Sequence, residues 1–257
     1  MAVVLIHTCP KGECWQVFFR PFINFGVPLF IFLSGYLTRT SYDDWKSFYS
    51  RRLLRVDVPY CIWTVIYTLD TLVSGNIGAL PYNLLTASAT YTLYYLFVYM
   101  QLVLLAPLSG MLATSRFWWT GLLVTPVSYL LQLCIGLGGV QVSDVLSLMY
   151  WRSFLGWYSY FYIGLLLGNR LKTPNMRISI ICALLLLSIP LQFLEAMAWQ
   201  RWGIPDIGTP LKLSGLLTNS LLMLVFGSLL SSYGKSDSCG LTQKNYLVSM
   251  GDLSFGI

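Results

Sequence analysis

The stretch ISIICALLLLSIPLQFLEAMAW, residues Ile178–Trp199, decides the fold class. It carries a single charged residue, and it is long enough to cross the hydrocarbon core of a bilayer, which takes about 20 residues of helix. Backbone amides find no water in that core, so a segment of this kind crosses it as a helix. The run is continuously apolar and does not alternate, which argues against a transmembrane β-barrel.

Similar apolar runs recur along the whole chain, and we predict about nine segments from their length and periodicity. The first is a stub at Met1–Thr8, and the last starts near Tyr246 and stops at the end of the sequence. The runs between them are Phe18–Leu37, Leu53–Val73, Thr92–Ala113, Phe117–Gly136, Ser153–Gly168, Ile178–Trp199 and Leu213–Ser232. The sequence therefore predicts an all-α, polytopic transmembrane helical bundle in one domain over residues 1–257, incomplete at both ends.

Composition agrees with a surface that faces lipid. The chain is 56% hydrophobic and 10% charged, whereas soluble domains carry about 25% charged residues. The net charge is +6, but the basic residues lie in short loops between apolar runs, which favours a membrane surface over nucleic acid. One histidine and cysteines without CxxC spacing predict no metal site.

The distribution of basic residues predicts the orientation of the bundle. If the first segment starts in the cytoplasm, the cytoplasmic loops hold 11 of the 16 Lys and Arg residues and the other loops hold 5, as the positive-inside rule requires. Those 11 residues are Arg39, Lys46, Arg51, Arg52, Arg55, Arg116, Arg170, Lys172, Arg177, Lys235 and Lys244.

An ionisable residue inside a membrane segment is a functional hypothesis by default. His7, the only histidine, lies in the apolar stub AVVLIHT. Its unperturbed pKa lies near neutrality, which suits a general base for a hydroxyl nucleophile. The alternative is a histidine that reaches the interface at a helix end near Pro10.

The segment SRRLLRVDVPY, residues 50–60, places three arginines at the mouth of an apolar run. Helical spacing puts Arg51 and Arg55, and also Arg52 and Arg55, on one face. Arg52 and Arg55 then form a forked donor surface suited to the phosphates of a nucleotide-derived donor such as coenzyme A. The alternative, most relevant to Arg51, is an anchor for lipid head groups. Asp57 is two residues from Arg55 and faces elsewhere, so we expect its partner on another helix.

Two further polar residues are candidates with equally plain alternatives. Ser34, in FGVPLFIFLSGYL (Phe25–Leu37), either bonds a backbone or substrate group or simply packs. Glu195 either orients an acceptor hydroxyl, pairs with Arg201, or is an interfacial acid. No P-loop, GxSxG, HExxH or GxGxxG motif occurs, so ATP hydrolysis and dinucleotide chemistry are not expected.

Six pieces in a fixed order give the chain a resemblance to the membrane acyltransferase 3 family. The pieces are VVLIH (Val3–His7), VPLFIFLSGYL (Val27–Leu37), RRLLRVDVPY (Arg51–Tyr60), YYLFVYMQLVLLAPL (Tyr94–Leu108), YFYIGLLLG (Tyr160–Gly168) and LSFGI (Leu253–Ile257). The resemblance implies about ten helices in the full protein. It also implies transfer of an acyl group, often acetyl, from a cytoplasmic acyl-CoA to a sugar of a polysaccharide or glycolipid.

By this resemblance His7 matches the catalytic histidine of the family, and Arg52 and Arg55 match its paired arginines. The family's basic residue about eleven positions before the histidine falls before this sequence begins, and Asp57 stands where the family pattern is apolar. We expect no permanently bound cofactor, acyl-CoA as donor substrate, the lipid bilayer and a carbohydrate or glycolipid acceptor as partners, and no nucleic acid. A bacterial inner membrane is the location that the resemblance implies.

The resulting hypothesis is an integral-membrane O-acyltransferase. The expected catalytic residues are His7, Arg55 and Ser34, and the expected substrate-binding residues are Arg51, Arg52, Asp57 and Glu195. One alternative is an exporter of polysaccharide or lipid-linked sugar whose polar residues line a path. Another is a sensory or structural membrane domain.

Overall fold

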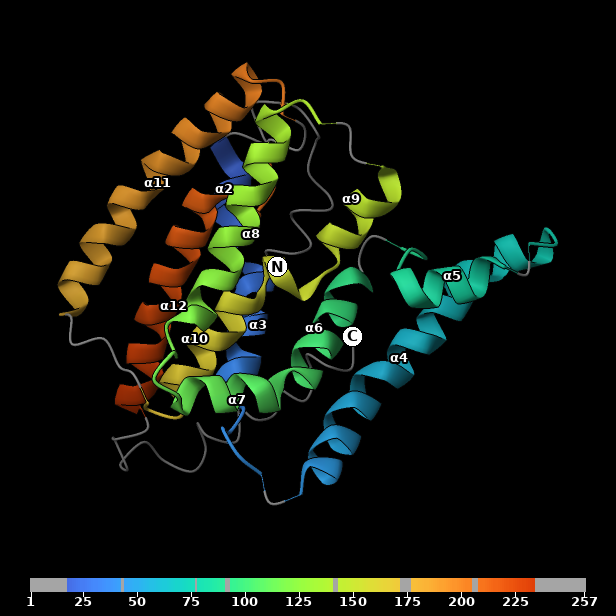
Figure 1. The fold of residues 1–257 in the computed structure, drawn as a ribbon, viewed down its shortest axis with the longest axis horizontal. Coiled ribbons are helices and arrows are strands. Elements are labelled where there is room, and N and C mark those ends of the chain that lie inside the picture. Colours follow the sequence, from blue (N-terminus) through green and yellow to red (C-terminus); the bar gives the residue numbers. More distant parts are fainter. Residues whose placement is uncertain are drawn as a thin grey trace.

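Helices make up all the regular structure in the described part of the chain (Figure 1). The computed structural model describes residues 18–42, 44–76, 78–90, 93–140, 143–171, 177–204 and 208–233. Its elements are α2 (Arg20–Ile23), α3 (Gly26–Tyr36), α4 (Trp45–Val73), α5 (Ala79–Thr86), α6 (Tyr94–Leu104), α7 (Ala106–Thr114), α8 (Thr120–Leu137), α9 (Asp144–Trp151), η3 (Phe154–Gly156), α10 (Tyr158–Gly168), α11 (Ile178–Arg201) and α12 (Leu213–Tyr233). The all-α prediction is confirmed. The predicted first and last segments lie outside the described residues.

Among the described residues, four helices are long and apolar enough to cross a membrane: α4, α8, α11 and the Leu213–Leu230 part of α12. α6 and α7 pass the same test together but are bent by 52°, as in a broken span or a re-entrant loop. The bend falls at Leu105, just before Pro107, whose ring nitrogen cannot donate a backbone hydrogen bond. α3 and α10 are shorter apolar helices. The prediction of a multi-pass helical membrane bundle is confirmed.

The helices alternate in direction, which brings two sets of termini together. α3, α7, α10 and α12 end where α4, α8 and α11 begin (Figure 1). We call this side the basic end, because the three arginines at residues 51, 52 and 55 lie in the first turns of α4. The side where α11 ends and α12 begins is called the opposite end. The basic end is the side that the loop charges predict to be cytoplasmic.

The centre of the bundle is the contact between α3 and α10, which is the most extensive helix pair in the structure. A Cβ atom on Gly35, Gly164 or Gly168 would come closer than 3.0 Å to the backbone of the partner helix. The glycines therefore let the two backbones touch, as small residues do at helix contacts in membranes.

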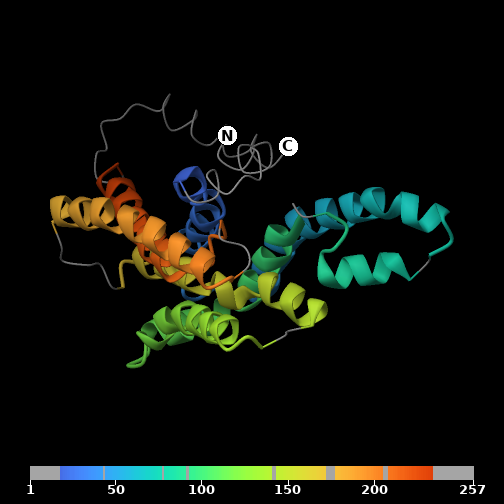
Figure 2. The same ribbon diagram turned by 90° about the horizontal axis from the view of Figure 1, so that it is seen from above.

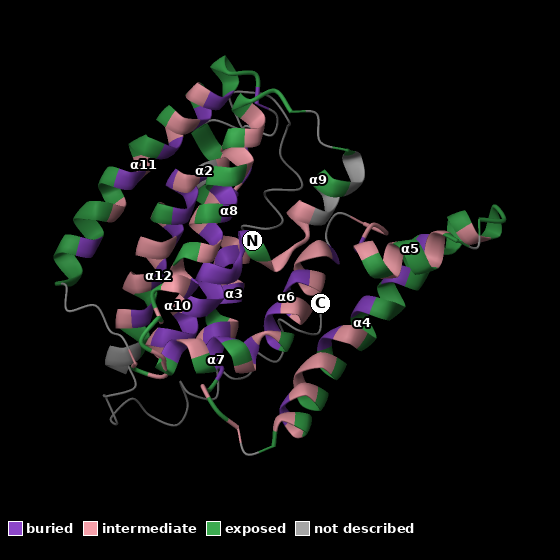
Figure 3. Ribbon diagram, in the orientation of Figure 1, coloured by how far each residue is buried: buried purple, intermediate pink, exposed green. Residues whose placement is uncertain are grey.

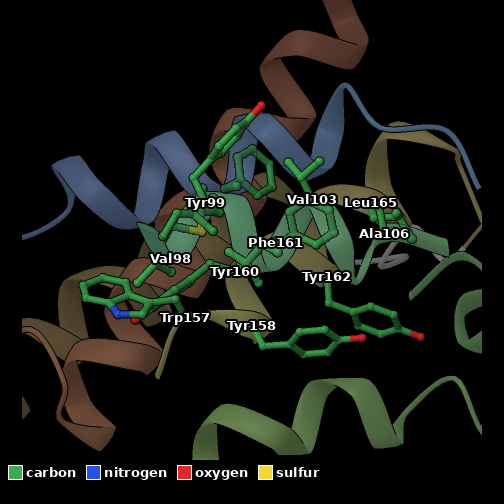
Figure 4. Close-up of a cluster of buried hydrophobic side chains, with 14 of the residues drawn as sticks. Val98, Tyr99, Val103, Ala106, Trp157, Tyr158, Tyr160, Phe161, Tyr162 and Leu165 are labelled. Carbon is green, nitrogen blue, oxygen red and sulfur yellow. The ribbon is translucent and has the colours of Figure 1, made fainter. Parts of the chain in front are cut away.

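Aromatic side chains fill the space around this contact. Trp157, Tyr160, Phe161 and Tyr162 are almost completely buried, and Figure 4 shows them packed with residues of α6. By contrast α11 presents apolar side chains outward, with Leu186 and Leu187 each 68% exposed, and its outer face is largely green in Figure 3. Burial at the centre and exposed leucines outside are what a bundle surrounded by lipid requires.

Helix α4 starts eight residues before the predicted run, because Asp44 caps it: its carboxylate accepts a hydrogen bond from the Ser47 amide at 3.2 Å. Together α4 and α5 project from the other helices in both views (Figures 1 and 2). The two are tied together by the Tyr60 hydroxyl, which donates to the Leu84 carbonyl at 2.7 Å. The main contacts of α4 are with α5 and α6.

Candidate functional site

Arg52 joins the first turns of α4 to the end of α3. Its Nη1 donates to the Thr38 hydroxyl at 2.7 Å and more weakly to the Ser34 carbonyl at 3.4 Å, and its Nη2 donates to the Leu37 carbonyl at 2.9 Å. The guanidinium also lies 5.1 Å from the ring centroid of Phe48. The last carbonyls of a helix lack partners and carry partial negative charge, which explains why a fork of N–H donors binds there.

Asn169 completes this junction from the end of α10. Its side-chain nitrogen donates to the carbonyls of Thr38 and Leu165, both at 2.8 Å, and its side-chain oxygen accepts from the Thr40 amide at 3.3 Å. Three helix termini thus meet at the basic end through one arginine and one amide. The position of α4 relative to the bundle core is set by these contacts.

Arg51 and Arg55 lie on the same helix but do not bind the end of α3 as Arg52 does. Both are exposed; Arg51 Nε donates to the Ser47 carbonyl at 3.2 Å within α4. In the described part of the chain the structure shows no hydrogen bond or ion pair for Arg55. One guanidinium is therefore anchored and two are presented outward, all within two helical turns. Arg51 and Arg55 therefore remain accessible to an anionic ligand at the basic end.

Asp57 and Ser34 each bury a polar oxygen. Asp57 Oδ1 and Ser34 Oγ have no hydrogen-bond partner among the described residues. Ser34 is next to Arg52 through its carbonyl, so the structure brings these two predicted residues together. The expected partner of Asp57 on another helix is not found within the described ranges. A buried carboxylate oxygen without a partner is costly, so a hydrogen-bond donor placed beside Asp57 would stabilise it.

Glu195 lies at the other side of the bundle. Its carboxylate accepts from the amides of Leu213 at 3.3 Å and Ser214 at 2.8 Å, and from the Ser214 hydroxyl. It therefore caps the start of α12. Asn24, just before α3, donates to the Gly208 carbonyl at 3.1 Å and ties the loop before α12 to that end. Arg52 binds the other end of the 11-residue helix α3, about 16 Å away at 1.5 Å per residue. The structure thus separates Glu195 from the arginines.

His7 lies outside the described residues, so its expected place in the site stays a prediction. Among the described residues there is no group of three or more His, Cys, Asp or Glu side chains placed to hold a metal ion. What the described site offers is hydrogen-bond donors: two outward guanidiniums, one anchored guanidinium and a buried hydroxyl. Donors of this kind bind phosphate and stabilise oxygen that acquires negative charge.

Comparison with known families decides between the candidate classes. A family model described as an acyltransferase domain matches residues 1–257, the whole chain. The chain belongs to the membrane acyltransferase 3 family. It is an O-acyltransferase of the multi-pass membrane type, and the resemblance seen in the sequence is confirmed. Comparisons with curated proteins and with solved structures find no match.

Sequence reasoning did not anticipate several residues that shape this acyltransferase. Thr38 and Asn169 hold the junction at the basic end, and Lys212 and Trp199 pack together at the opposite end. Asn169 directly follows the last glycine of α10, a place where a helix commonly ends with a polar cap. That signal was present in the sequence. Nothing local to Lys212 predicts its burial, because its neighbours come from other helices.

Proposed function

We propose that the acyltransferase moves an acyl group, acetyl by family resemblance, from a cytoplasmic acyl-CoA to a hydroxyl of a cell-surface carbohydrate or glycolipid. The observation that carries the proposal is that one arginine of α4 is bound within the protein while two neighbouring arginines are exposed. Arg52 is held by the end of α3, while Arg51 and Arg55 stay exposed beside it. A donor with several phosphates binds such a pair through charge-assisted hydrogen bonds.

The reaction needs a base and donors for developing charge. The acceptor oxygen attacks the thioester carbonyl carbon, and His7 takes the hydroxyl proton as the C–O bond forms. The oxyanion of the tetrahedral intermediate receives hydrogen bonds from Arg55 and from Ser34, whose Oγ has no partner in the described structure. Collapse breaks the C–S bond, and the coenzyme A thiolate leaves with the proton that His7 returns. The products are an ester and the free thiol.

Asp57 and Glu195 take different places in this proposal. Asp57 lies two residues from Arg55 and has a buried oxygen that could accept a hydrogen bond, so we propose that it binds substrate. Both oxygens of Glu195 already accept from the start of α12. We therefore propose that Glu195 holds the start of α12 in place and does not bind the acceptor directly.

The test is transfer of label from acyl-labelled acetyl-CoA to glycan in membranes that carry the full-length protein. His7→Ala is expected to abolish transfer, and Arg55→Ala to lower kcat/KM for acetyl-CoA at least tenfold, the equivalent of one charge-assisted hydrogen bond of about 1.4 kcal/mol. Arg116→Ala is the matched control, because Arg116 is also an exposed cation at the basic end. Wild-type rates in both His7→Ala and Arg55→Ala would refute the mechanism. Glycan export without transfer of label would support an exporter instead.

A further inference from the structure

Helix α7 lies at the basic end and runs across the direction of the long helices α8 and α12 (Figure 1). The chain bends by 52° between α6 and α7, just before a proline in the first turn of α7. After the bend the chain passes beside the ends of α3 and α10 and does not continue along the bundle. The proposed reaction does not use this helix.

Both ends of α7 lie at the basic end. The carbonyl of Leu104, just before the bend, accepts a hydrogen bond at 3.2 Å from the hydroxyl of Tyr49, which lies near the start of α4. A Cβ atom on Gly110, in the middle of α7, would overlap the backbone of Thr40, a residue beyond the end of α3. Residues 115–119 then lead into α8, which begins at this end. Because a membrane span must carry the chain from one side of the bilayer to the other, α7 by itself does not cross.

The two faces of α7 differ in side-chain size. The buried residues are Ala106, Ser109, Gly110 and Ala113. Ser109 Oγ lies 3.0 Å from the Tyr158 hydroxyl of α10, so the small residues face the bundle. Leu108 is 62% exposed and Met111 69% exposed, and their spacing of three residues places both on one face. A helix bordering water shows the opposite pattern, with its large apolar side chains inward.

Exposed aromatic side chains continue this apolar face beyond the end of α7. Phe117 and Trp119, in the connection to α8, are both exposed. Tryptophan is enriched where the hydrocarbon core of a membrane meets water, because its ring is apolar and its N–H group is polar. The exposed side chains after α7 thus match the depth of the lipid head groups.

Exposed cations lie beside the contact that holds α7. Arg39 directly precedes Thr40, whose backbone touches Gly110, and Arg170 directly follows Asn169, whose side-chain oxygen accepts from the Thr40 amide. Both arginines are exposed. The basic end is predicted to be cytoplasmic, and anionic lipids of the cytoplasmic leaflet attract arginines near the membrane surface. The charge at this end therefore complements such a surface.

We infer that α7 is an interfacial helix that binds the phospholipid surface of the cytoplasmic leaflet. Leu108 and Met111 contact the upper part of the acyl chains, while Phe117 and Trp119 lie at the level of the head groups, as in other helices that rest in the plane of the interface. An interfacial α7 is not the second half of a broken span. Its placement does not depend on the proposed reaction.

The experiment measures the depth of spin labels on the full-length acyltransferase in vesicles of phosphatidylethanolamine and phosphatidylglycerol. Single cysteines at Leu108 and Met111 are labelled with a nitroxide in a background in which the native cysteines are replaced by alanine. Collision with oxygen, which concentrates in lipid, is compared with collision with a water-soluble nickel chelate. Leu187→Cys is the control for the hydrocarbon centre, since Leu187 is 68% exposed and close to the middle of α11. Lys46→Cys is the control for water, since Lys46 is exposed in the first turn of α4.

We expect the labels in Leu108→Cys and Met111→Cys to lie about 5–10 Å into the boundary between head groups and acyl chains. Their oxygen-to-nickel ratios should be several-fold above that of Lys46→Cys and several-fold below that of Leu187→Cys. Ratios equal to that of Leu187→Cys would place α7 in a broken span, and ratios equal to that of Lys46→Cys would place it in water; either result overturns the inference. Labels shielded from both agents would also overturn it, because a protein segment or a second copy of the chain would then cover this face.

Discussion

Arg52 and Arg55 are three residues apart on α4, yet the structure predicts that their removal has different consequences. Arg52 donates at 2.7 Å to Thr38 and at 2.9 Å to the Leu37 carbonyl, and it also packs on Phe48. A hydrogen bond from a charged donor contributes about 1.5–3 kcal/mol when buried. Arg52 is only half-buried and water replaces part of what is lost, so we expect Arg52→Ala to lower the free energy of unfolding by about 2 kcal/mol.

Arg55→Ala should leave the free energy of unfolding unchanged within about 0.5 kcal/mol, because Arg55 is exposed. Arg52→Lys should recover about half of the loss, since an ammonium cannot fork between the Thr38 hydroxyl and the Leu37 carbonyl. The assay is denaturant titration of the full-length protein in mixed micelles, read together with the KM for acyl-CoA. The reasoning fails if Arg52→Ala is as stable as wild type, or if Arg55→Ala loses as much stability as Arg52→Ala.

Three other predictions concern packing, titration and capping. Gly35→Ala should destabilise the bundle by about 1–3 kcal/mol through overlap with the backbone of α10, whereas Gly136→Ala, which meets only side-chain atoms at 3.5 Å, should be neutral in the same micelle titration. The pKa of Lys212 falls from 10.5 to about 8 on folding, so between these pH values the unfolded chain binds a proton that the folded chain lacks. The free energy of unfolding should therefore rise by about 3 kcal/mol from pH 8 to 10.5. Subtraction of the profile of Lys212→Met isolates this rise, and equal slopes of unfolding free energy against pH in the two proteins would contradict it. Glu195→Ala should cost about 1–2 kcal/mol because the first amides of α12 lose their acceptor, and an unchanged melting temperature would argue against that cap.

The membrane segments were predictable because their signal is local. The run at Ile178–Trp199 became α11, Ile178–Arg201, and the run at Leu213–Ser232 became α12. The runs at Phe18–Leu37 and Thr92–Ala113 are each divided in the structure, into α2 with α3 and into α6 with α7. Hydropathy registers length and polarity, and it does not register where a helix bends. The short helices α5 and α9 were not predicted, since neither stands out as an apolar run of spanning length.

The site was less predictable because its contacts join distant segments. The spacing of Arg52 and Arg55 indicated a common ligand, but the sequence does not show that Thr38 and Leu37 bind one of them. Glu195 was expected near an acceptor or near Arg201, while its partners in the structure are Leu213 and Ser214. A polar side chain near a helix end has many acceptable partners, and only the three-dimensional arrangement selects one.

The glycine contact between α3 and α10 also restricts where a substrate can pass between helices. Where two backbones touch at Gly35, Gly164 and Gly168, no side chain is present that can swing aside to open a corridor. A passage there would need whole helices to part, which would lose the close packing that the glycines allow. We therefore expect substrates to approach each other between other helices of the bundle. Helix α4, whose main neighbours are α5 and α6, lies outside this contact and is joined to the end of α3 by Arg52.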